Sequence, residues 1–380
     1  MKKNIETVRD SKACCGCENC SNICPKNAII IQHDKEGFKY PVVDSNKCVA
    51  CGLCLLSCPV EHLRKEEKHS EIVQIFATYI NSPDNLIKSS SGGMGYCLMN
   101  YCLRNGIHSF GVSYSENYTR AKYIEIKDRE DIQACLGAKY IQAKKNDCFK
   151  IIEKYLIDSE KVLFIGLPCE VAALKVFLKT DYKNLFTVEL ICHGPTSDYA
   201  AEQFIQRISG KRFLKSFTIK HKKKGWTPGY IRAVYEDGHV FSKIFDSTEY
   251  GFAFRNFSRP SCYSCHFRGH NSFADITIGD YWGASEKDPC WNRDGVSLVL
   301  IHSDKGINMF NKLTEMIAFP IDYDHAIVGN STIYKSRSKG IRDKYSKDFV
   351  LYGSAKARKI NETYKEYFIR VLRDAYYFVK

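Results

Sequence analysis

Residues 14–25 read CCGCENCSNICP, and residues 48–59 repeat the same spacing as CVACGLCLLSCP. Each stretch places four cysteines in the order Cys-x2-Cys-x2-Cys-x3-Cys and follows the last of them with a proline. Bacterial two-cluster ferredoxins bind [4Fe–4S] clusters with this run, and the fourth cysteine of each run ligates the cluster of the other run. The two stretches therefore predict an α+β, ferredoxin-like module that holds two clusters and moves electrons.

The crossed ligation divides the eight cysteines into two sets. The first set is Cys14, Cys17, Cys20 and Cys58, and the second set is Cys48, Cys51, Cys54 and Cys24. Cys15 fits neither set, and we expect it to be a bystander. Residues 25–47 connect the two runs and are expected to form a hairpin.

Length and cysteine content limit the class of protein. A chain of 380 residues is too long for a ferredoxin alone and predicts two or three domains. Its eighteen cysteines follow no apolar signal segment behind Met1, which favours a reducing cytoplasm over a secreted disulfide framework. No stretch of about 18 uncharged apolar residues occurs, so no transmembrane segment is expected.

The formal net charge of +13 is concentrated at the C-terminal end. Residues 331–380 contain thirteen Lys and Arg against five Asp and Glu. Because no recognition motif accompanies this charge, a nucleic acid partner is not expected. Attraction of an acidic, ferredoxin-type electron donor is a better interpretation, since electrostatic steering raises association rates. A solvated basic surface stays open as an alternative.

The same tail shows apolar residues at helical spacing from Ile360 to Ala375. This pattern predicts an amphipathic helix packed on the body of the protein. A basic helix that docks on a partner or on an anionic membrane surface is the alternative.

Beyond residue 70 the pattern is that of an α/β domain with a mainly parallel sheet. Residues 162–165 and 185–191 read as strands, and each is followed by a helical pattern. Strand–helix–strand connections of this size make the two strands parallel. Cys169 and Cys192, which follow the two strands, are therefore expected at one carboxyl edge of the sheet, where ligands collect.

Another pair of cysteines completes a possible third metal site. Cys262 and Cys265 form a Cys-x2-Cys pair ahead of an expected strand at residues 274–278. The third set, Cys169, Cys192, Cys262 and Cys265, supplies enough thiolates for a third [4Fe–4S] cluster. A zinc ion would accept the same ligands, and the spacing alone does not choose between the two metals.

Several motifs, in order along residues 70–330, resemble the coenzyme F420 hydrogenase/dehydrogenase beta-subunit family. They are Ser91-Gly92-Gly93, LGAKYI at 136–141, GLPCEVAAL at 166–174, CHGP at 192–195, the Cys262 pair and DITIGDYWG at 275–283. The resemblance implies FAD, a [4Fe–4S] cluster on the third set, and electron transfer between iron–sulfur chains and an organic substrate. Ala138 departs from the serine common in the family's Gly-Ser-Lys-Tyr motif, which puts one flavin hydrogen bond in doubt.

The resemblance implies two groups of flavin contacts. Ser91, Gly92 and Gly93 precede a helical pattern, and the free N–H groups and dipole at a helix start favour an anion such as the flavin pyrophosphate. Lys139 and Tyr140 form the second group, in which a cation near the flavin ring would stabilise its reduced anion. The sequence identifies no catalytic acid or base.

The expected function is that of an iron–sulfur flavoprotein oxidoreductase. Electrons would pass from a ferredoxin-type donor through three [4Fe–4S] clusters and FAD to a small organic molecule. The alternatives are a coenzyme F420-linked subunit of a larger hydrogenase or dehydrogenase, which would make the protein part of an oligomer, and a non-catalytic electron-transfer adaptor. Three regions are expected. Residues 1–66 form the ferredoxin-like module, and residues 331–380 form a basic helical tail. Between them lies the flavin domain, whose first part is residues 70–155 and whose second part, residues 156–330, holds the third cluster.

Overall fold

The N-terminal hairpin connects the two cysteine runs, as the sequence predicts. In the computed structural model, which describes residues 4–63, 71–115, 117–268 and 272–379, strands β1 (Ile29–His33) and β2 (Lys39–Val43) pair antiparallel. Asp34 sets the turn, because its carboxylate accepts the backbone N–H groups of Glu36 and Phe38. Short helices flank the hairpin: α1 (Glu6–Asp10), α2 (Asn19–Asn22), α3 (Leu53–Leu56) and α4 (Pro59–Leu63).

One large sheet forms the centre of the molecule. Its spatial order is β13-β3-β12-β11-β7-β6-β4-β5. The bounds are β3 (Gln74–Ile80), β4 (His108–Ser115), β5 (Arg120–Ile126), β6 (Val162–Gly166), β7 (Leu185–Leu190), β11 (Ile276–Asp280), β12 (Ser297–Ile301) and β13 (Met316–Pro320). β3 pairs with β12, and β4 pairs with β6. Both expected parts of the flavin domain, residues 70–155 and 156–330, therefore contribute strands to this one sheet.

The expectation of a mainly parallel sheet is wrong, because the sheet is mixed. The neighbours β4, β6, β7 and β11 run parallel. The outer pairs are antiparallel: β4 with β5, β11 with β12, and β3 with both β12 and β13. A short connection such as the one between β4 and β5 returns the chain directly and therefore makes an antiparallel pair. The sequence argument rested on β6 and β7, the pair with a helix between them.

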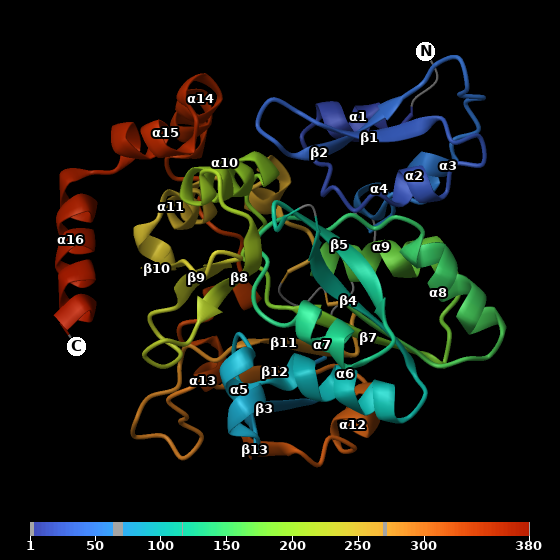
Figure 1. The fold of residues 1–380 in the computed structure, drawn as a ribbon. Helices are drawn as coiled ribbons and strands as arrows, with labels where there is room; N and C mark the ends of the chain where they lie inside the picture. Colours follow the sequence, from blue (N-terminus) through green and yellow to red (C-terminus); the bar gives the residue numbers. More distant parts are fainter. Residues whose placement is uncertain (1–3, 64–70, 116, 269–271, 380) are drawn as a thin grey trace.

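Helices cover both faces of the large sheet (Figure 1). The side chains of β6 alternate between two cores, with Leu163 and Ile165 on one face and Val162 and Phe164 on the other. The first face is covered by α5 (Pro83–Lys88), α6 (Met94–Arg104), α7 (Arg129–Cys135) and α12 (Asp304–Phe310). The second face is covered by α8 (Cys148–Ile157), α9 (Pro168–Leu178) and α10 (Asp198–Ser209).

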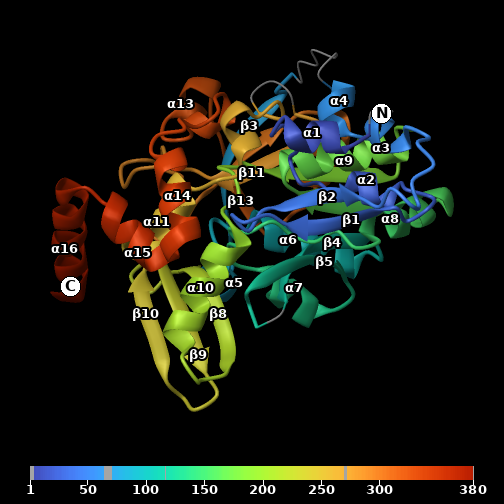
Figure 2. The same cartoon turned by 90° about the horizontal axis from the view of Figure 1, so that it is seen from above.

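A smaller antiparallel sheet extends away from this body (Figure 2). It consists of β8 (Leu214–His221), β9 (Tyr230–Tyr235) and β10 (Val240–Ile244). The chain then returns through η1 (Phe245–Ser247), α11 (Glu249–Asn256) and η2 (Pro260–Ser264), and later through α13 (Tyr323–Ile327) and η3 (Ser331–Ile333). The return through η2 carries two of the third-set cysteines back to the body.

The C-terminal tail is helical, as predicted, with α14 (Arg342–Tyr352), α15 (Ser354–Asn361) and α16 (Tyr364–Val379). However, the expectation that its last helix packs its apolar face on the body is wrong. Phe368 and Leu372 are 53% and 54% exposed, and α16 lies at the edge of the molecule (Figure 1). The helix contacts the body through polar groups instead, including a 2.7 Å hydrogen bond from Arg373 to Ser247. Helical spacing identifies an apolar face but not what covers it.

Across the described part of the chain, none of the helices is both long enough and apolar enough to cross a bilayer.

A buried ion pair of the large-sheet domain lies where this domain meets the N-terminal module. The Lys145 ammonium donates to Glu170 Oε1 at 2.5 Å, and the Lys145 backbone N–H donates to Glu18 of the module at 2.9 Å. Lys145 and Glu170 are both buried. Burial alone would lower the pKa of Lys145, but the carboxylates of Glu170 and Glu18 raise it, so this lysine is charged.

We expect Glu170→Ala to destabilise the protein by about 3–5 kcal/mol, because it leaves a buried ammonium without its partner. Lys150→Ala is the matched control: it breaks a 3.1 Å pair with Asp147 on the surface and should cost only about 0–1 kcal/mol. Anaerobic urea denaturation of the iron-loaded proteins compares the two. Similar midpoints for both variants would contradict the structural role of the buried pair.

Candidate metal centres

The first set of cysteines surrounds one cavity in the N-terminal module. Cys20 lies on α2, Cys58 lies immediately before α4, and the thiol of Cys20 interacts electrostatically with those of Cys14, Cys17 and Cys58. Other side chains lining the cavity include Ile5, Ile31, Lys39, Pro41 and Val60. The fourth thiol comes from the second run, as the crossed ligation predicts.

The second set surrounds a neighbouring cavity. Its lining includes Cys24 from the first run and Cys48, Cys51 and Cys54 from the second. The N–H of Ala28 donates to the Cys24 sulfur at 3.3 Å, and such N–H···S bonds tune a bound cluster. Cys20 and Cys54 interact across the two sets, so the cavities are adjacent.

The third set forms at the carboxyl edge of the large sheet. β6 and β7 pair in parallel, with Val162 opposite Leu185 at one end and Gly166 opposite Glu189 at the other. Cys169 follows β6 as the second residue of α9, and Cys192 follows β7, so both leave the same edge as predicted. The thiol of Cys192 interacts electrostatically with those of Cys262 and Cys265, which η2 brings to this edge.

Gly194 allows the close approach of this loop to η2. Its φ is +103°, and a Cβ added there would lie 3.1 Å from the Cβ and 3.2 Å from the sulfur of Cys262. Any L side chain would therefore be strained and crowded. The Gly194 N–H also donates to the Cys192 sulfur at 3.3 Å.

Burial disfavours free thiolates in these sets. Burial raises the pKa of Cys58 and of Cys192 to about 12 and that of Cys262 to about 11, so a metal must displace the protons. All cysteines are free thiols, and within the described ranges no group of three or more His, Cys, Asp or Glu side chains has the geometry to hold a single metal ion. Four soft sulfur donors around a shared space fit an iron–sulfur cluster.

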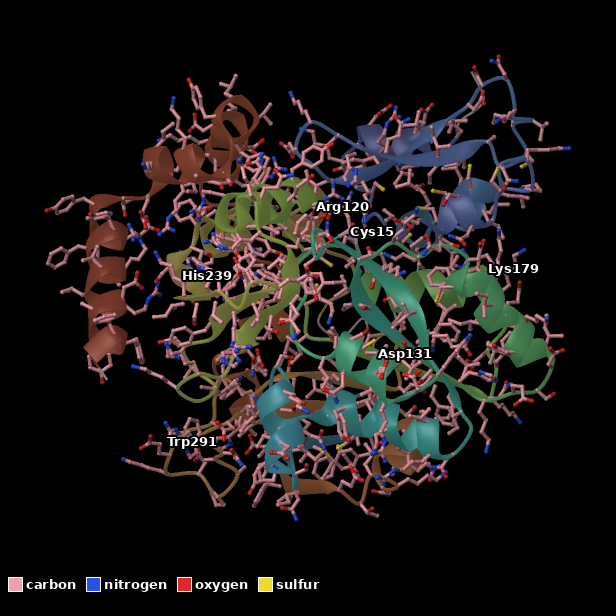
Figure 3. The ribbon with its side chains drawn as sticks, viewed as in Figure 1. Cys15, Arg120, Asp131, Lys179, His239 and Trp291 are labelled. Carbon is pink, nitrogen blue, oxygen red and sulfur yellow. The ribbon has the colours of Figure 1, made fainter. Side chains whose placement is uncertain are left out.

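Cys15, the expected bystander, lies between the first and third sets. Its thiol interacts electrostatically with that of Cys17 in the first set and that of Cys169 in the third set. Figure 3 shows Cys15 at the boundary between the N-terminal module and the large sheet. The spacing of the cysteine runs gives no signal for this position, because Cys15 is outside both runs.

Direct hydrogen bonds hold the module against the third set. Ser261 on η2 donates to the Cys14 carbonyl at 3.0 Å, and Gln142 donates to the Cys15 carbonyl at 2.8 Å. Asn19 on α2 donates to the Ala173 carbonyl of α9 at 3.1 Å. In Figure 1 the module accordingly lies beside α9, the helix that carries Cys169.

The predicted flavin loop is closely packed against the sheet. The Ser91 hydroxyl donates to the Val296 carbonyl at 2.8 Å. A Cβ added to Gly92 would lie 2.2 Å from the Thr78 carbonyl oxygen, and Gly93, with φ +91°, caps α6. Backbone packing and conformation therefore explain both glycines without a ligand.

The second group of predicted flavin contacts is also engaged within the protein. The Lys139 ammonium donates to the carbonyls of Cys135, Leu136 and Gly137 at 2.8–3.3 Å, at the end of α7. Burial lowers the pKa of Lys139 to about 8. Tyr140 stacks on Phe254 with ring centroids 4.0 Å apart. These contacts fit a structural role better than a flavin cradle.

An aromatic and charged group at the same edge was not predicted. Lys220 pairs with Asp280, the last residue of β11, and lies 4.7 Å from the Trp282 ring centroid. Trp282 stacks on Trp226 with centroids 4.7 Å apart and is 46% exposed. The sequence contains the aspartate and the tryptophan in one motif, but Lys220 comes from β8 and is brought there only by the fold.

Two family descriptions match this chain. Residues 13–62 match a 4Fe-4S dicluster domain, and residues 159–322 match the C terminus of the coenzyme F420 hydrogenase/dehydrogenase beta subunit. The first match covers the cavities of the first and second sets. The second match contains all cysteines of the third set.

Curated relatives match either the module or most of the chain. An uncharacterized ferredoxin of Methanocaldococcus jannaschii is 45% identical over 12% of this chain and 29% of its own length. One subunit of the F420H2 dehydrogenase of Methanosarcina mazei is 23% identical over 83% of this chain and 86% of its own length. The coenzyme F420-dependent sulfite reductase of Methanocaldococcus jannaschii is 22% identical over 81% of this chain and 47% of its own length. This chain thus spans less than a third of the length of the ferredoxin and about half of the length of the sulfite reductase.

Among solved structures, the F420-reducing [NiFe] hydrogenase complex from Methanosarcina barkeri contains a chain with 19% identity and a TM-score of 0.48, over 78% of this chain and 93% of that one. The two family matches and the resemblance of the motifs agree. The chain therefore carries a 4Fe-4S dicluster domain followed by the C-terminal domain of the coenzyme F420 hydrogenase/dehydrogenase beta-subunit family.

Proposed function

We propose that this protein is an iron–sulfur electron-transfer subunit of a coenzyme F420-linked oxidoreductase. One arrangement carries the proposal: hydrogen bonds from Ser261 to the Cys14 carbonyl and from Asn19 to the Ala173 carbonyl hold the first set against the elements that carry the third set. Electrons entering the module would therefore reach the edge of the large sheet without leaving the protein. The relative named as part of an F420H2 dehydrogenase, which matches most of this chain, favours this function over a stand-alone flavoprotein reductase.

The proposed cofactors are three [4Fe–4S] clusters, one for each set of cysteines. When bound, a cluster supplies one-electron transfer. The chain holds the sulfur ligands on short helices and strand ends, and it directs N–H groups of Ala28 and Gly194 at two of the sulfurs.

FAD is a further part of the proposal and rests on the family resemblance. Its expected contacts do not form a cradle: the Ser91 hydroxyl and the Lys139 ammonium already donate to backbone carbonyls, and Gly92 packs on β3. We therefore derive no step through FAD. Trp282, half-exposed at the edge that carries the third set, offers a surface on which a ring system can stack.

Electron exchange with the deazaflavin tests this function. Anaerobic, iron-loaded protein is mixed with reduced coenzyme F420 and a viologen acceptor, and the absorbance of F420 is followed. We expect oxidation of F420 that depends on the protein, with FAD released by acid extraction and identified by mass analysis. Protein with full iron and flavin that leaves reduced F420 unchanged would contradict the proposal.

A stand-alone reductase is the second candidate. It is favoured by the dicluster domain within the same chain, which provides its own entry for electrons from a ferredoxin-type donor. The flavin-loaded protein would then accept electrons from reduced ferredoxin but not from F420, and would pass them to a small organic substrate. Iron-loaded protein that binds no flavin would instead indicate an electron-transfer adaptor.

The first candidate, the subunit of an F420-linked oxidoreductase, also predicts an oligomeric complex with further electron-transfer partners.

A further inference from the structure

Arg259 is a buried cation without a carboxylate partner. Its side chain is only 1% exposed, and its Nε and Nη1 atoms have no hydrogen-bond partner among the described residues. Its Nη2 donates to the Lys39 carbonyl at 2.9 Å and to Gln142 Oε1 at 2.8 Å, both of which are neutral oxygens. Burying a guanidinium in this way is costly unless a nearby negative charge compensates for it.

The position of Arg259 connects the first and third sets. Its backbone carbonyl accepts the Cys262 N–H at 3.0 Å, so the residue begins the turn that carries the third set. Its guanidinium reaches the first set, because a Cβ added to Gly16, between Cys15 and Cys17, would lie 2.5 Å from Nη2. The ring of Tyr40 lies 4.6 Å from the guanidinium carbon and limits its movement.

The charge of Arg259 acts on thiols of both sets. The guanidinium interacts electrostatically with the thiols of Cys14 in the first set and Cys262 in the third set. The guanidinium also interacts electrostatically with Cys15, Tyr40 and the carboxylate of Asp34. Ligated clusters on the first and third sets would place further negative charge beside it. Reduction of a cluster adds one more negative charge, and a fixed cation favours that reduced form.

We propose that Arg259 is the shared counter-charge of the first and third clusters and holds the reduction potentials of both centres above the values they would have without it. This inference rests on the proposed function, since it requires clusters on both sets. Arg259 is a positioning residue in this proposal: it contacts neither substrate nor iron, and it acts through the field it exerts on both centres.

Arg337 provides a comparison that acts on one set only. Its guanidinium lies 3.0 Å from His193 Nδ1, next to Cys192, and 5.7 Å from the ring of Tyr263, next to Cys262. No described contact joins Arg337 to the first set. Removal of its charge should therefore affect the third cluster alone.

The test is an anaerobic redox titration followed by electron paramagnetic resonance, with signals assigned from a Cys262→Ser, Cys265→Ser variant. We expect Arg259→Gln to lower the reduction potentials of the first and third clusters. Arg337→Gln should lower only the reduction potential of the third cluster. Arg259→Lys keeps the positive charge, so its two potentials should stay close to those of the unmodified protein. Arg358→Gln, a buried arginine paired with Glu362 in the tail, should change no potential.

A second variant keeps the proposal testable if Arg259→Gln loads iron poorly. Gln142→Glu is nearly isosteric and places a carboxylate on the Nη2 atom, neutralising the guanidinium without removing it. It should lower the same two potentials. Unchanged potentials in an iron-replete, folded Arg259→Gln or Gln142→Glu variant would overturn the proposal and leave Arg259 a structural residue. Zinc in place of iron at the third set would instead contradict the proposed function, which iron analysis detects before any titration.

Discussion

Replacing Cys17 with serine is expected to stop electron delivery from a reduced ferredoxin to the large domain. Cys17 belongs to the first set, the set of the module that lies against the third set, and it lines the same cavity as Cys14, Cys20 and Cys58. A serine hydroxyl is a much poorer ligand for iron than a thiolate. The rate of ferredoxin-driven reduction should therefore fall to background, while a small dye that reaches the domain directly should still react.

Cys15→Ser is the matched control for this variant. It changes the neighbouring thiol in the same loop, at a position that the crossed ligation does not use. This protein should keep the iron content of the unmodified chain. Equal loss of reduction by ferredoxin and by the dye in Cys17→Ser would mean that the module is structural or that the variant misfolds, and would contradict the electron route.

The double replacement Cys262→Ser, Cys265→Ser should remove about four of about twelve irons, since each [4Fe–4S] cluster contains four. The module should keep its two clusters, because its cysteines line separate cavities. Iron and sulfide analysis, with paramagnetic resonance of the reduced protein, measures the loss. Electron transfer to F420 should be lost with the third cluster.

Cys290→Ser is the control for this double variant. Cys290 is buried but lies in a different apolar core, among residues such as Tyr281 and Leu298. It should therefore retain all of the iron. If the double variant also keeps about twelve irons, the third set does not hold a cluster.

The sequence predicted the parts of this site that have a strict local pattern. The cysteine runs place eight thiols around two cavities because their spacing is set by the cofactor and not by the rest of the fold. The strand at residues 162–165, the helix after it and the next strand were also identified, and their parallel pairing explains why Cys169 and Cys192 meet at one edge.

Features that depend on packing between distant segments were not predicted. β3 and β13 enter the sheet antiparallel at its edge, and nothing in their own residues specifies that neighbour. Ser91 and Lys139 have the residue types of a flavin site, but the carbonyls that bind them come from the folded chain. Arg259 could not be selected among many arginines, because its burial between two cysteine sets becomes visible only when the module docks on η2.

Metal analysis of the unmodified protein, purified without oxygen, tests the central claim most directly. Three clusters predict about twelve irons and about twelve sulfides per chain, with no stoichiometric zinc. Mössbauer spectra should assign all of this iron to [4Fe–4S] centres. About eight irons together with one zinc would contradict the account, because the module would then have no third cluster to which it could pass electrons.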